Sequence, residues 1–199
     1  MTLGFIIPFR GVRVGKTRLR AHMPAAAVDT LSERMLANVI GAVRGAKPAA
    51  PLVLITRTRA GLSAPSGMTV LEQQLDHNDA VEFARATLVE RGVTRVAVVS
   101  SDLPLLQPAD IDALLDPAAS VIIAADAHQQ GTNALVFPAA EPHFSRFGAS
   151  SARLHCAQAE QRGLSIARVH TAALTHDVDT TDQIDDAVRA ACAPAWGRD

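Results

Sequence analysis

Cationic residues and glycines gather directly after the first apolar run of the chain, Leu3–Pro8. The segment contains Arg10, Gly11, Arg13, Gly15, Lys16 and Arg18. Glycines let backbone N–H groups approach an anion, and lysine and arginine neutralise phosphate oxygens. The segment therefore predicts a phosphate-binding loop, with an ordinary solvated basic loop as the alternative. Gly15-Lys16-Thr17 is similar to the end of a P-loop, but the first glycine of that motif would fall on Arg10, which excludes it.

Acidic residues occupy two places that strand or helix boundaries should bring to one edge of a sheet. Asp102 follows the apolar run Val93–Ser100. Asp177 and Asp179 lie just before the last helical pattern, two residues apart, so they fall on the same side of an extended segment. Mg²⁺ prefers one or two carboxylates and completes its shell with water and phosphate oxygens. We therefore predict a Mg²⁺ site made by Asp102 with Asp179 or Asp177. The alternatives are a turn role for Asp102 and a helix N-terminal role for the other acids.

Small and hydroxylated residues form a third group, at Gly131-Thr132-Asn133 and again at Phe147–Ser151. Their hydroxyl and N–H donors suit a phosphate or carboxylate, although such residues are also common in turns. We expect His155, on the helix that follows, to be a surface histidine, with an anion contact as the alternative. Cys156 shows no nucleophile signature in the sequence, so covalent catalysis has no support.

Composition limits the class of protein. The chain has 199 residues, of which 48 % are apolar and 20 % charged, so we expect one packed domain over residues 1–199. The net charge of −1 argues against a nucleic-acid partner. The run Leu3–Phe9 is too short for a membrane helix or a signal sequence. Cys156 and Cys192 show no metal or redox spacing and suit a reduced cytosol, so a cytoplasmic protein without membrane partners is expected.

Short apolar runs alternate with helical patterns along the chain. The expected strands are 3–8, 52–56, 93–100 and 121–124, with 68–71 a weaker candidate. We expect Thr30, Asn78 and Thr181 to cap helices, and Pro108 to lie in the first turn of another. This alternation predicts an α/β fold with a mostly parallel sheet flanked by helices. The less regular segment 132–169 is expected to add an antiparallel strand at 133–137, a strand at 165–169 and a lid.

Taken in order, these motifs resemble the CofC family, the 2-phospholactate guanylyltransferases of coenzyme F-420 biosynthesis, whose relatives use phosphoenolpyruvate or 3-phosphoglycerate. The matching segments are Pro8–Arg10, Gly15–Leu19, Asp102–Leu105, Gly131–Leu135, Phe147–Ser151 with Arg153 and His155, and Asp177–Thr180. Two positions depart from the family. Arg10 replaces a lysine, and the family's Gly-Leu-Asn reads Asp76-His77-Asn78, so that only Asn78 is kept.

The resemblance implies a nucleotidyltransferase fold of the GT-A-like, Rossmann-like type and a reaction in which GMP passes from GTP to a three-carbon phosphoacid. It implies that Lys16 and Asp102 are catalytic and that Mg²⁺ binds Asp102, Asp179 and Asp177. Nucleotide contacts would come from Arg10, Lys16, Arg18 and Asn78, and phosphoacid contacts from Thr132, Gly148 and Ser151. A monomer or a homodimer is expected. The alternatives are a molybdenum-cofactor or sugar-nucleotide enzyme and a non-catalytic GTP-binding regulatory domain.

Overall fold

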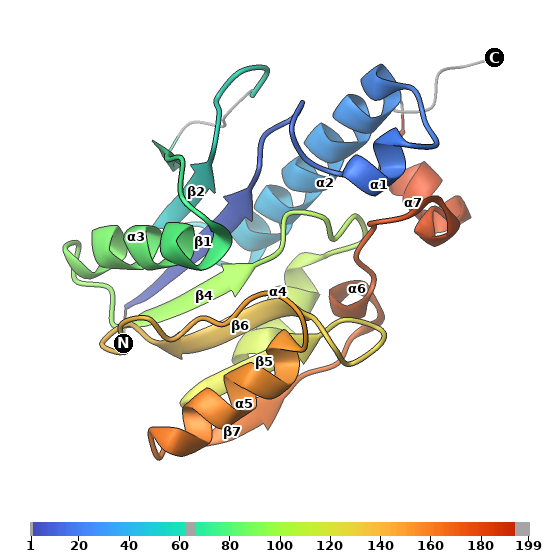
Figure 1. The fold of residues 1–199 in the computed structure, drawn as a ribbon. Helices are drawn as coiled ribbons and strands as arrows, with labels where there is room; N and C mark the ends of the chain where they lie inside the picture. Colours follow the sequence, from blue (N-terminus) through green and yellow to red (C-terminus); the bar gives the residue numbers. More distant parts are fainter. Residues whose placement is uncertain (1, 63–66, 194–199) are drawn as a thin grey trace.

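A seven-stranded sheet runs through the computed structural model, which describes residues 2–62 and 67–193 (Figure 1). The strand order is β3-β2-β1-β4-β6-β5-β7. The strands are β1 Leu3–Phe9, β2 Leu52–Thr56, β3 Thr69–Glu72, β4 Arg95–Val99, β5 Val121–Ala125, β6 Thr132–Pro138 and β7 Ile166–Arg168. Only β6 runs antiparallel to its neighbours β4 and β5 among these strands. A mostly parallel sheet with an antiparallel strand at 133–137 is therefore confirmed.

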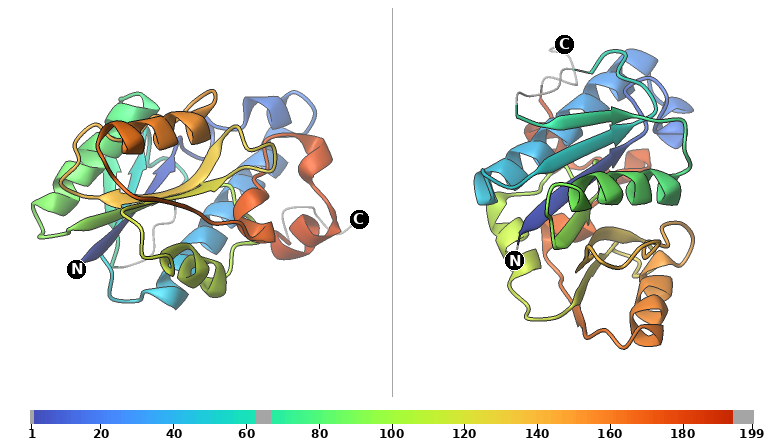
Figure 2. Two further views of the ribbon diagram at one scale, coloured as in Figure 1. Left: turned by 90° about the horizontal axis from the view of Figure 1, so that it is seen from below. Right: turned by 90° about the vertical axis from the view of Figure 1, so that its left-hand side faces the viewer.

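Helices cover both faces of the sheet (Figure 2, left). Helices α2 (Ala25–Ala46) and α4 (Pro108–Leu115) pack on one face, and α3 (His77–Val89) and α5 (Ser151–Gln161) pack on the other. Side chains alternate along β1, so that Phe5 and Ile7 join the first core while Ile6 joins the second. Burial on both faces explains why the strands are near-continuous apolar runs in the sequence.

A smaller apolar cluster lies beside the sheet and brings together segments from the first and the last fifth of the chain. It brings Leu19 of α1 (Thr17–Arg20) and Met35 of α2 together with Val178 and with Val188 of α7 (Asp186–Ala191). Two short elements, α6 (Ala172–Thr175) and the 3-10 helix η1 (Thr181–Gln183), complete this region. The cluster holds the segment 177–179 close to the loop after β1, and this contact positions the candidate site.

Three predicted helix caps are wrong. Helix α2 begins at Ala25 rather than after Thr30, whose hydroxyl donates to the Ala26 carbonyl inside the helix. The earlier start places Val28 in the side cluster, and this packing extends the helix. Asp76 caps α3 by accepting from the Asp79 N–H, so the cap lies two residues before Asn78.

At the end of the chain Thr180 caps η1, whereas Asp185 caps α7. The predicted cap at Thr181 is therefore replaced by caps at two neighbouring residues, Thr180 and Asp185. Pro108 does occupy the first turn of α4, as expected. Among the helices of the described ranges, none is long and apolar enough to cross a membrane.

Candidate active site

The loop after β1 is held in a fixed shape that presents Lys16 to the site. Gly11 has φ +116°, and a Cβ added there would lie 2.7 Å from Thr58 Cγ2, so a side chain at this position would be strained. Arg20 braces the loop, since its Nε donates to the Gly15 carbonyl at 2.8 Å and its Nη2 donates to the Val12 carbonyl at 2.6 Å. Lys16 itself takes the left-handed conformation with φ 57°. This sparsely populated conformation is one that functional residues often adopt when the surrounding structure enforces it.

Lys16 joins the two acidic segments that are distant in the sequence. The Val178 N–H donates to the Asp102 carbonyl at 3.2 Å, which sets the segment 177–179 beside the end of β4. Lys16 Nζ then pairs with Asp102 and also with Asp179 Oδ1, at 2.7 Å from the latter. The structure therefore brings together three of the residues that the sequence singled out.

The charges of this group stabilise one another. Burial by itself would lower the pKa of Lys16, but the attraction of Asp102 and Asp179 outweighs it, so the pKa is raised above its ordinary value. Burial of Asp179 opposes ionisation, but Lys16 holds the pKa of that carboxyl below its usual range. Both Lys16 and Asp179 are therefore charged at neutral pH.

Asp177 lies beside this group but has a different partner. Its carboxylate accepts from Asn133 Nδ2 at 3.1 Å. Burial and the nearby charges of Asp102 and Asp179 raise the pKa of Asp177. Within residues 2–62 and 67–193, no cluster of three or more histidine, cysteine, aspartate or glutamate side chains is arranged as a metal-binding group. The set of Asp102, Asp177 and Asp179 is therefore not assembled as a three-carboxylate centre.

The donor set nevertheless fits a cation. Asp102 Oδ1 is buried and has no hydrogen-bond partner among the described residues. A buried carboxylate oxygen without a partner is costly unless a cation or donor meets it. The ammonium group of Lys16, which lies between Asp102 and Asp179, shows that these carboxylates accommodate positive charge. Oxygen donors of this kind are the ones that Mg²⁺ prefers.

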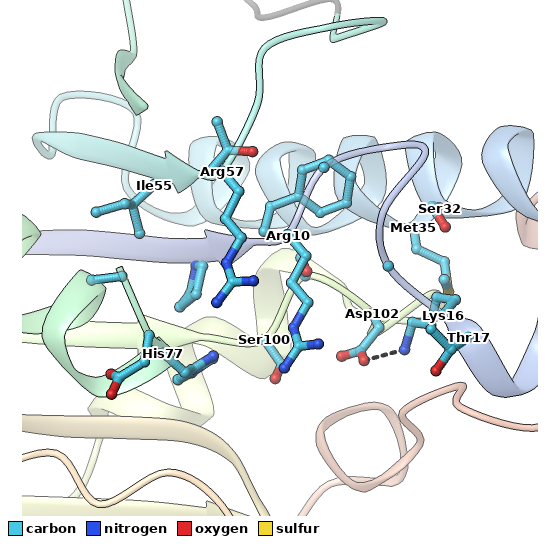
Figure 3. A pocket seen from close by; sticks show the side chains of 18 of the residues that line it. Arg10, Lys16, Thr17, Ser32, Met35, Ile55, Arg57, His77, Ser100 and Asp102 are labelled. Atoms are coloured by element: carbon cyan, nitrogen blue, oxygen red, sulfur yellow. Dashed lines mark hydrogen bonds and ion pairs between the residues drawn. The ribbon is translucent and has the colours of Figure 1, made fainter. Parts of the chain in front are cut away.

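A cavity of about 420 Å³ opens beside this group at the carboxyl edge of the parallel strands (Figure 3). Lys16, Arg10, Arg18, Asp102 and Asp179 all line it. Its volume falls in the range of small-molecule sites, and its position at the strand ends is where open α/β sheets bind ligands. The predicted cationic loop and the acids therefore share one concave surface.

The sequence reasoning missed Arg57, and it named His77 only as part of the segment that departs from the family's motif. Arg57 follows β2 directly and extends into the cavity beside Arg10, and His77 at the start of α3 lines the same wall (Figure 3). Burial and the charge of Arg10 lower the pKa of His77, so its ring is neutral at neutral pH. Residues that follow buried parallel strands meet at one edge of the sheet. This rule, which identified the residues after β1 and β4, also predicts Arg57 when it is applied to β2.

Asn78 is not among the described residues that line the cavity. Its side chain is instead bound to the Phe147 backbone, accepting from the N–H at 2.8 Å and donating to the carbonyl at 3.0 Å. Phe147 in turn contacts the rings of His77 and His155, with centroids 4.9 and 5.0 Å apart. Asn78 therefore ties α3 to the loop that carries Gly148, whose φ of +133° is open only to glycine.

Of the residues predicted to bind the phosphoacid, Thr132 and Ser151 form a buried neutral group with His155 between β6 and α5, whereas Gly148 is exposed, and none of the three predicted residues is among the described residues that line the cavity. Ser151 Oγ donates to Thr132 Oγ1 at 3.0 Å, and Thr132 Oγ1 lies 3.0 Å from His155 Nδ1. The expectation that His155 lies on the surface is wrong, since its side chain is fully buried. Helix α5 turns this position toward the sheet, because Ala152, His155 and Ala159 share its buried face.

Comparisons with known proteins agree with this architecture. Residues 3–188 match the family described as "Guanylyl transferase CofC like". The phosphoenolpyruvate guanylyltransferase of Chloroflexus aggregans is 32 % identical over 92 % of this chain and 95 % of its own length. The 3-phospho-D-glycerate guanylyltransferase of Phenylobacterium zucineum is 30 % identical over 94 % and 90 %.

A solved structure supports the fold independently. A candidate nucleotide-diphospho-sugar transferase from Desulfovibrio desulfuricans G20 superposes with a TM-score of 0.72 over 90 % of this chain and 84 % of that one. The two sequences are 18 % identical, so the likeness bears on the fold alone. The α/β nucleotidyltransferase architecture expected from the sequence is confirmed.

Proposed function

This chain belongs to the CofC-like guanylyl transferases, and we propose that it transfers GMP from GTP to the phosphate of a three-carbon phosphoacid. The observation that carries the proposal is the placement of Lys16 between Asp102 and Asp179 on the wall of the cavity. A lysine and two carboxylates on one wall give a site that can bind phosphate oxygens and a cation at once. The phosphoacid would be 2-phospholactate, phosphoenolpyruvate or 3-phosphoglycerate, and the product would serve coenzyme F-420 biosynthesis in the cytoplasm.

The proposed reaction is an in-line displacement. A phosphate oxygen of the phosphoacid forms a bond to the α-phosphorus of GTP, while the bond from that phosphorus to the bridging oxygen of the β-phosphate breaks and pyrophosphate leaves. The attacking oxygen is already anionic, so no general base is needed. Positioning and charge neutralisation then supply the rate enhancement.

Each cationic residue of the cavity has a place in this scheme. Lys16 would hold the triphosphate and neutralise the charge that develops on pyrophosphate, with Arg10 and Arg18 acting from the same loop. Asp102 and Asp179 would hold Mg²⁺, with Asp177 next to them. When bound, the metal would neutralise phosphate charge and align the reacting groups.

The experiment that tests the proposal measures pyrophosphate release with each nucleoside triphosphate against each of the three phosphoacids. We expect release with GTP and with at least one phosphoacid, and much less with ATP, CTP or UTP. Equal turnover with ATP would remove the guanylyl assignment and leave the nucleotidyl class standing. The absence of release from every pair would overturn the proposal.

The same assay separates the alternatives. A molybdenum-cofactor or sugar-nucleotide enzyme would release pyrophosphate only with a different acceptor. A regulatory domain would bind GTP without releasing pyrophosphate and would tolerate the loss of Asp102. The family match favours guanylyl transfer over both alternatives, and the joint presence of paired acids and cations on one cavity wall favours catalysis over a regulatory domain.

A further inference from the structure

The ammonium group of Lys16 fills the space between the two carboxylates that are proposed to hold a metal. It pairs with Asp102 Oδ2, as Figure 3 shows, and lies 2.7 Å from Asp179 Oδ1. One oxygen of each carboxylate is thus taken by the lysine. The Lys16 side chain is 13 % exposed, so these contacts are largely shielded from water. A cation that belongs to the protein therefore occupies this place.

The lysine satisfies the two carboxylates only in part. Asp102 Oδ1 is buried and has no hydrogen-bond partner within residues 2–62 and 67–193. The Asp179 side chain is half exposed, so water and ions can reach it. A buried carboxylate oxygen without a partner is costly. The pair is therefore better suited to a cation with several coordination positions, such as Mg²⁺, than to a single ammonium group.

The same two carboxylates cannot serve an ammonium group and a divalent cation at full strength. Mg²⁺ needs oxygens at about 2.0–2.1 Å in a near-octahedral shell, whereas an ammonium group lies about 2.7–2.9 Å from its acceptor. Two cations held by one pair of carboxylates would be close neighbours, and they would repel each other strongly in a partly buried site. Binding of a metal therefore requires Lys16 to withdraw from at least one carboxylate.

The Lys16 side chain can withdraw without movement of its loop. The loop backbone is braced by Arg20, whose Nε donates to the Gly15 carbonyl at 2.8 Å. The ammonium group lies at the end of a flexible stem of four carbons. This stem starts on the cavity wall that Arg10 and Arg18 also line. Rotation of the stem therefore moves the ammonium group from the carboxylates toward the place proposed for the triphosphate.

We propose that Lys16 is an exchangeable internal cation, which closes the pair of Asp102 and Asp179 in the metal-free protein and is released to the triphosphate when a divalent cation binds. The inference rests on the proposed function, because it takes Asp102 and Asp179 as the metal ligands. The closed pair keeps the two carboxylates neutralised and withholds Lys16 from the nucleotide until the metal is in place. Metal and triphosphate therefore strengthen each other's binding through Lys16.

The lysine content of the chain gives a direct readout, because lysine occurs only at positions 16 and 47. In protein labelled with ¹³C-lysine, the two Cε–Hε signals are assigned with Lys47→Met. Lys47 pairs with Asp112 on the exposed surface and is the internal control. Addition of Mg²⁺ without nucleotide, at constant ionic strength, should shift the Lys16 signal and leave the Lys47 signal in place. A Lys16 signal that does not move at saturating Mg²⁺ would overturn the proposal.

Metal affinity tests the competition itself. Mn²⁺, which suits the same oxygen ligands, is titrated into the protein without nucleotide, and free Mn²⁺ is measured by electron paramagnetic resonance. Lys16→Met removes the ammonium group at similar side-chain length. It should tighten Mn²⁺ binding roughly ten-fold or more, which corresponds to a lysine that closes the pair in about nine of ten molecules. Unchanged or weaker binding by this variant, or no binding by either protein, would overturn the exchange.

Arg18→Met is the matched control for charge. Arg18 is an exposed cation of the same loop and lines the same cavity, so its loss also makes the site more negative. Because exposed charges are screened, this variant should tighten Mn²⁺ binding by at most about three-fold. An equal gain in the Lys16→Met and Arg18→Met variants would assign the effect to net charge and overturn the exchange.

A GTP analogue that cannot be cleaved between its α- and β-phosphates tests where Lys16 goes. With Mg²⁺ present, the analogue should shift the Lys16 signal further. In EDTA it should leave this signal close to its metal-free position. A shift of the same size in EDTA would show that the triphosphate releases Lys16 by itself, and the proposed role of the metal in this release would be overturned.

These readouts are independent of turnover. If pyrophosphate release fails with every pair of substrates, the proposed reaction is removed, but the lysine spectra and the Mn²⁺ affinities still decide the exchange. Conversely, an absent exchange leaves the result of the pyrophosphate assay unchanged. If the Lys16→Met variant fails to fold, the ¹³C signals of the unmodified protein still decide the question.

Discussion

Two hydrogen-bonded groups at the same edge of the sheet, which we call the charged wall and the neutral wall, would recognise an anion by opposite means. The wall after β1 and β4 places Lys16 between two carboxylates, and the side chain of Asp179 remains 48 % exposed. The wall between β6 and α5 has no charge in its hydrogen-bonded group of Thr132, Ser151 and His155, and it is almost completely buried. One wall is suited to a highly charged triphosphate with a cation, and the other to a smaller anion that must be oriented.

The difference has an energetic reason. Charged groups that pair within a cavity retain long-range attraction for a phosphate chain and tolerate some misalignment. Neutral donors act only over a hydrogen-bond distance, so they must be held rigidly by buried partners. Loss of a group from the charged wall should therefore cost more than loss of one from the neutral wall.

The largest effect is expected from Asp102→Asn, which removes a charge at nearly constant shape. We expect a loss in kcat of roughly 10² or more with the fold preserved, because a charge-stabilising group is lost. Pyrophosphate release at saturating Mg²⁺ measures it. Asp112→Asn is the matched control, since Asp112 pairs with Lys47 on the exposed surface and should tolerate the change. Activity of this variant within a few-fold of that of the unmodified protein would show that Asp102 serves only to form a turn.

The burial of His155 should make the neutral wall sensitive to acid. The pKa of His155 is about 4 in the folded protein, compared with about 6.5 for an unperturbed histidine. Between these values the unfolded chain takes up a proton that the folded protein does not, so the free energy of unfolding falls as the pH falls from about 6.5 to about 4. The full contribution is about 3 kcal/mol by the pKa difference.

Urea unfolding at several pH values measures this dependence. His155→Asn should flatten the curve in that range, whereas His128→Asn, at an exposed position, should leave it unchanged. Asp179 acts in the same sense but over a more acidic range. Its pKa is lowered by Lys16, so its contribution is present above the ordinary aspartate pKa and is lost only at more acidic pH. If the free energy of unfolding depended on pH equally in the His155→Asn and His128→Asn variants, the burial of His155 would not be the cause of this dependence.

Lys16→Ala tests the charged wall from its cationic side. It should raise the KM for GTP and lower kcat, because charge also develops on the departing pyrophosphate, with a combined loss of about ten- to a hundred-fold. The phosphoacid KM should change little. Lys47→Ala removes a lysine from the exposed pair with Asp112 and serves as the control. If the Lys16→Ala variant instead showed a higher KM for the phosphoacid and an unchanged KM for GTP, the charged wall would bind the phosphoacid and the neutral wall GTP.

The smallest effect is expected from Ser151→Ala, which removes one neutral donor. The phosphoacid KM should rise by up to about ten-fold, and GTP binding measured without the acid should not change. Ser120→Ala is the control. Ser120 also belongs to a hydrogen-bonded pair of hydroxyl groups, since its Oγ accepts from Ser165 Oγ at 3.1 Å, but this pair is exposed. A Ser151 variant that loses GTP affinity and keeps its phosphoacid KM would contradict the contrast between the walls.

The sequence by itself determined the strands and the places where chemistry could lie. Buried parallel strands are apolar throughout, so their runs stand out, and the residues that follow β1 and β4 were identified because strand ends meet at one edge. The family's motifs also identified the class of reaction. The start of α2 at Ala25 and the Asp76 cap of α3 were missed because local capping signals at Thr30 and Asn78 compete with packing and with other acceptors.

Only the tertiary structure decided which of these residues meet. The Val178 to Asp102 hydrogen bond and the cluster of Leu19 with Val178 bring Lys16, Asp102 and Asp179 into one group, across a separation that no local pattern encodes. The burial of His155 and its contacts with Thr132 and with the Arg146 backbone likewise depend on how α5 packs against β6. Sequence periodicity marks an element's buried face, but the hydrogen-bond partners on that face are set by how the elements pack.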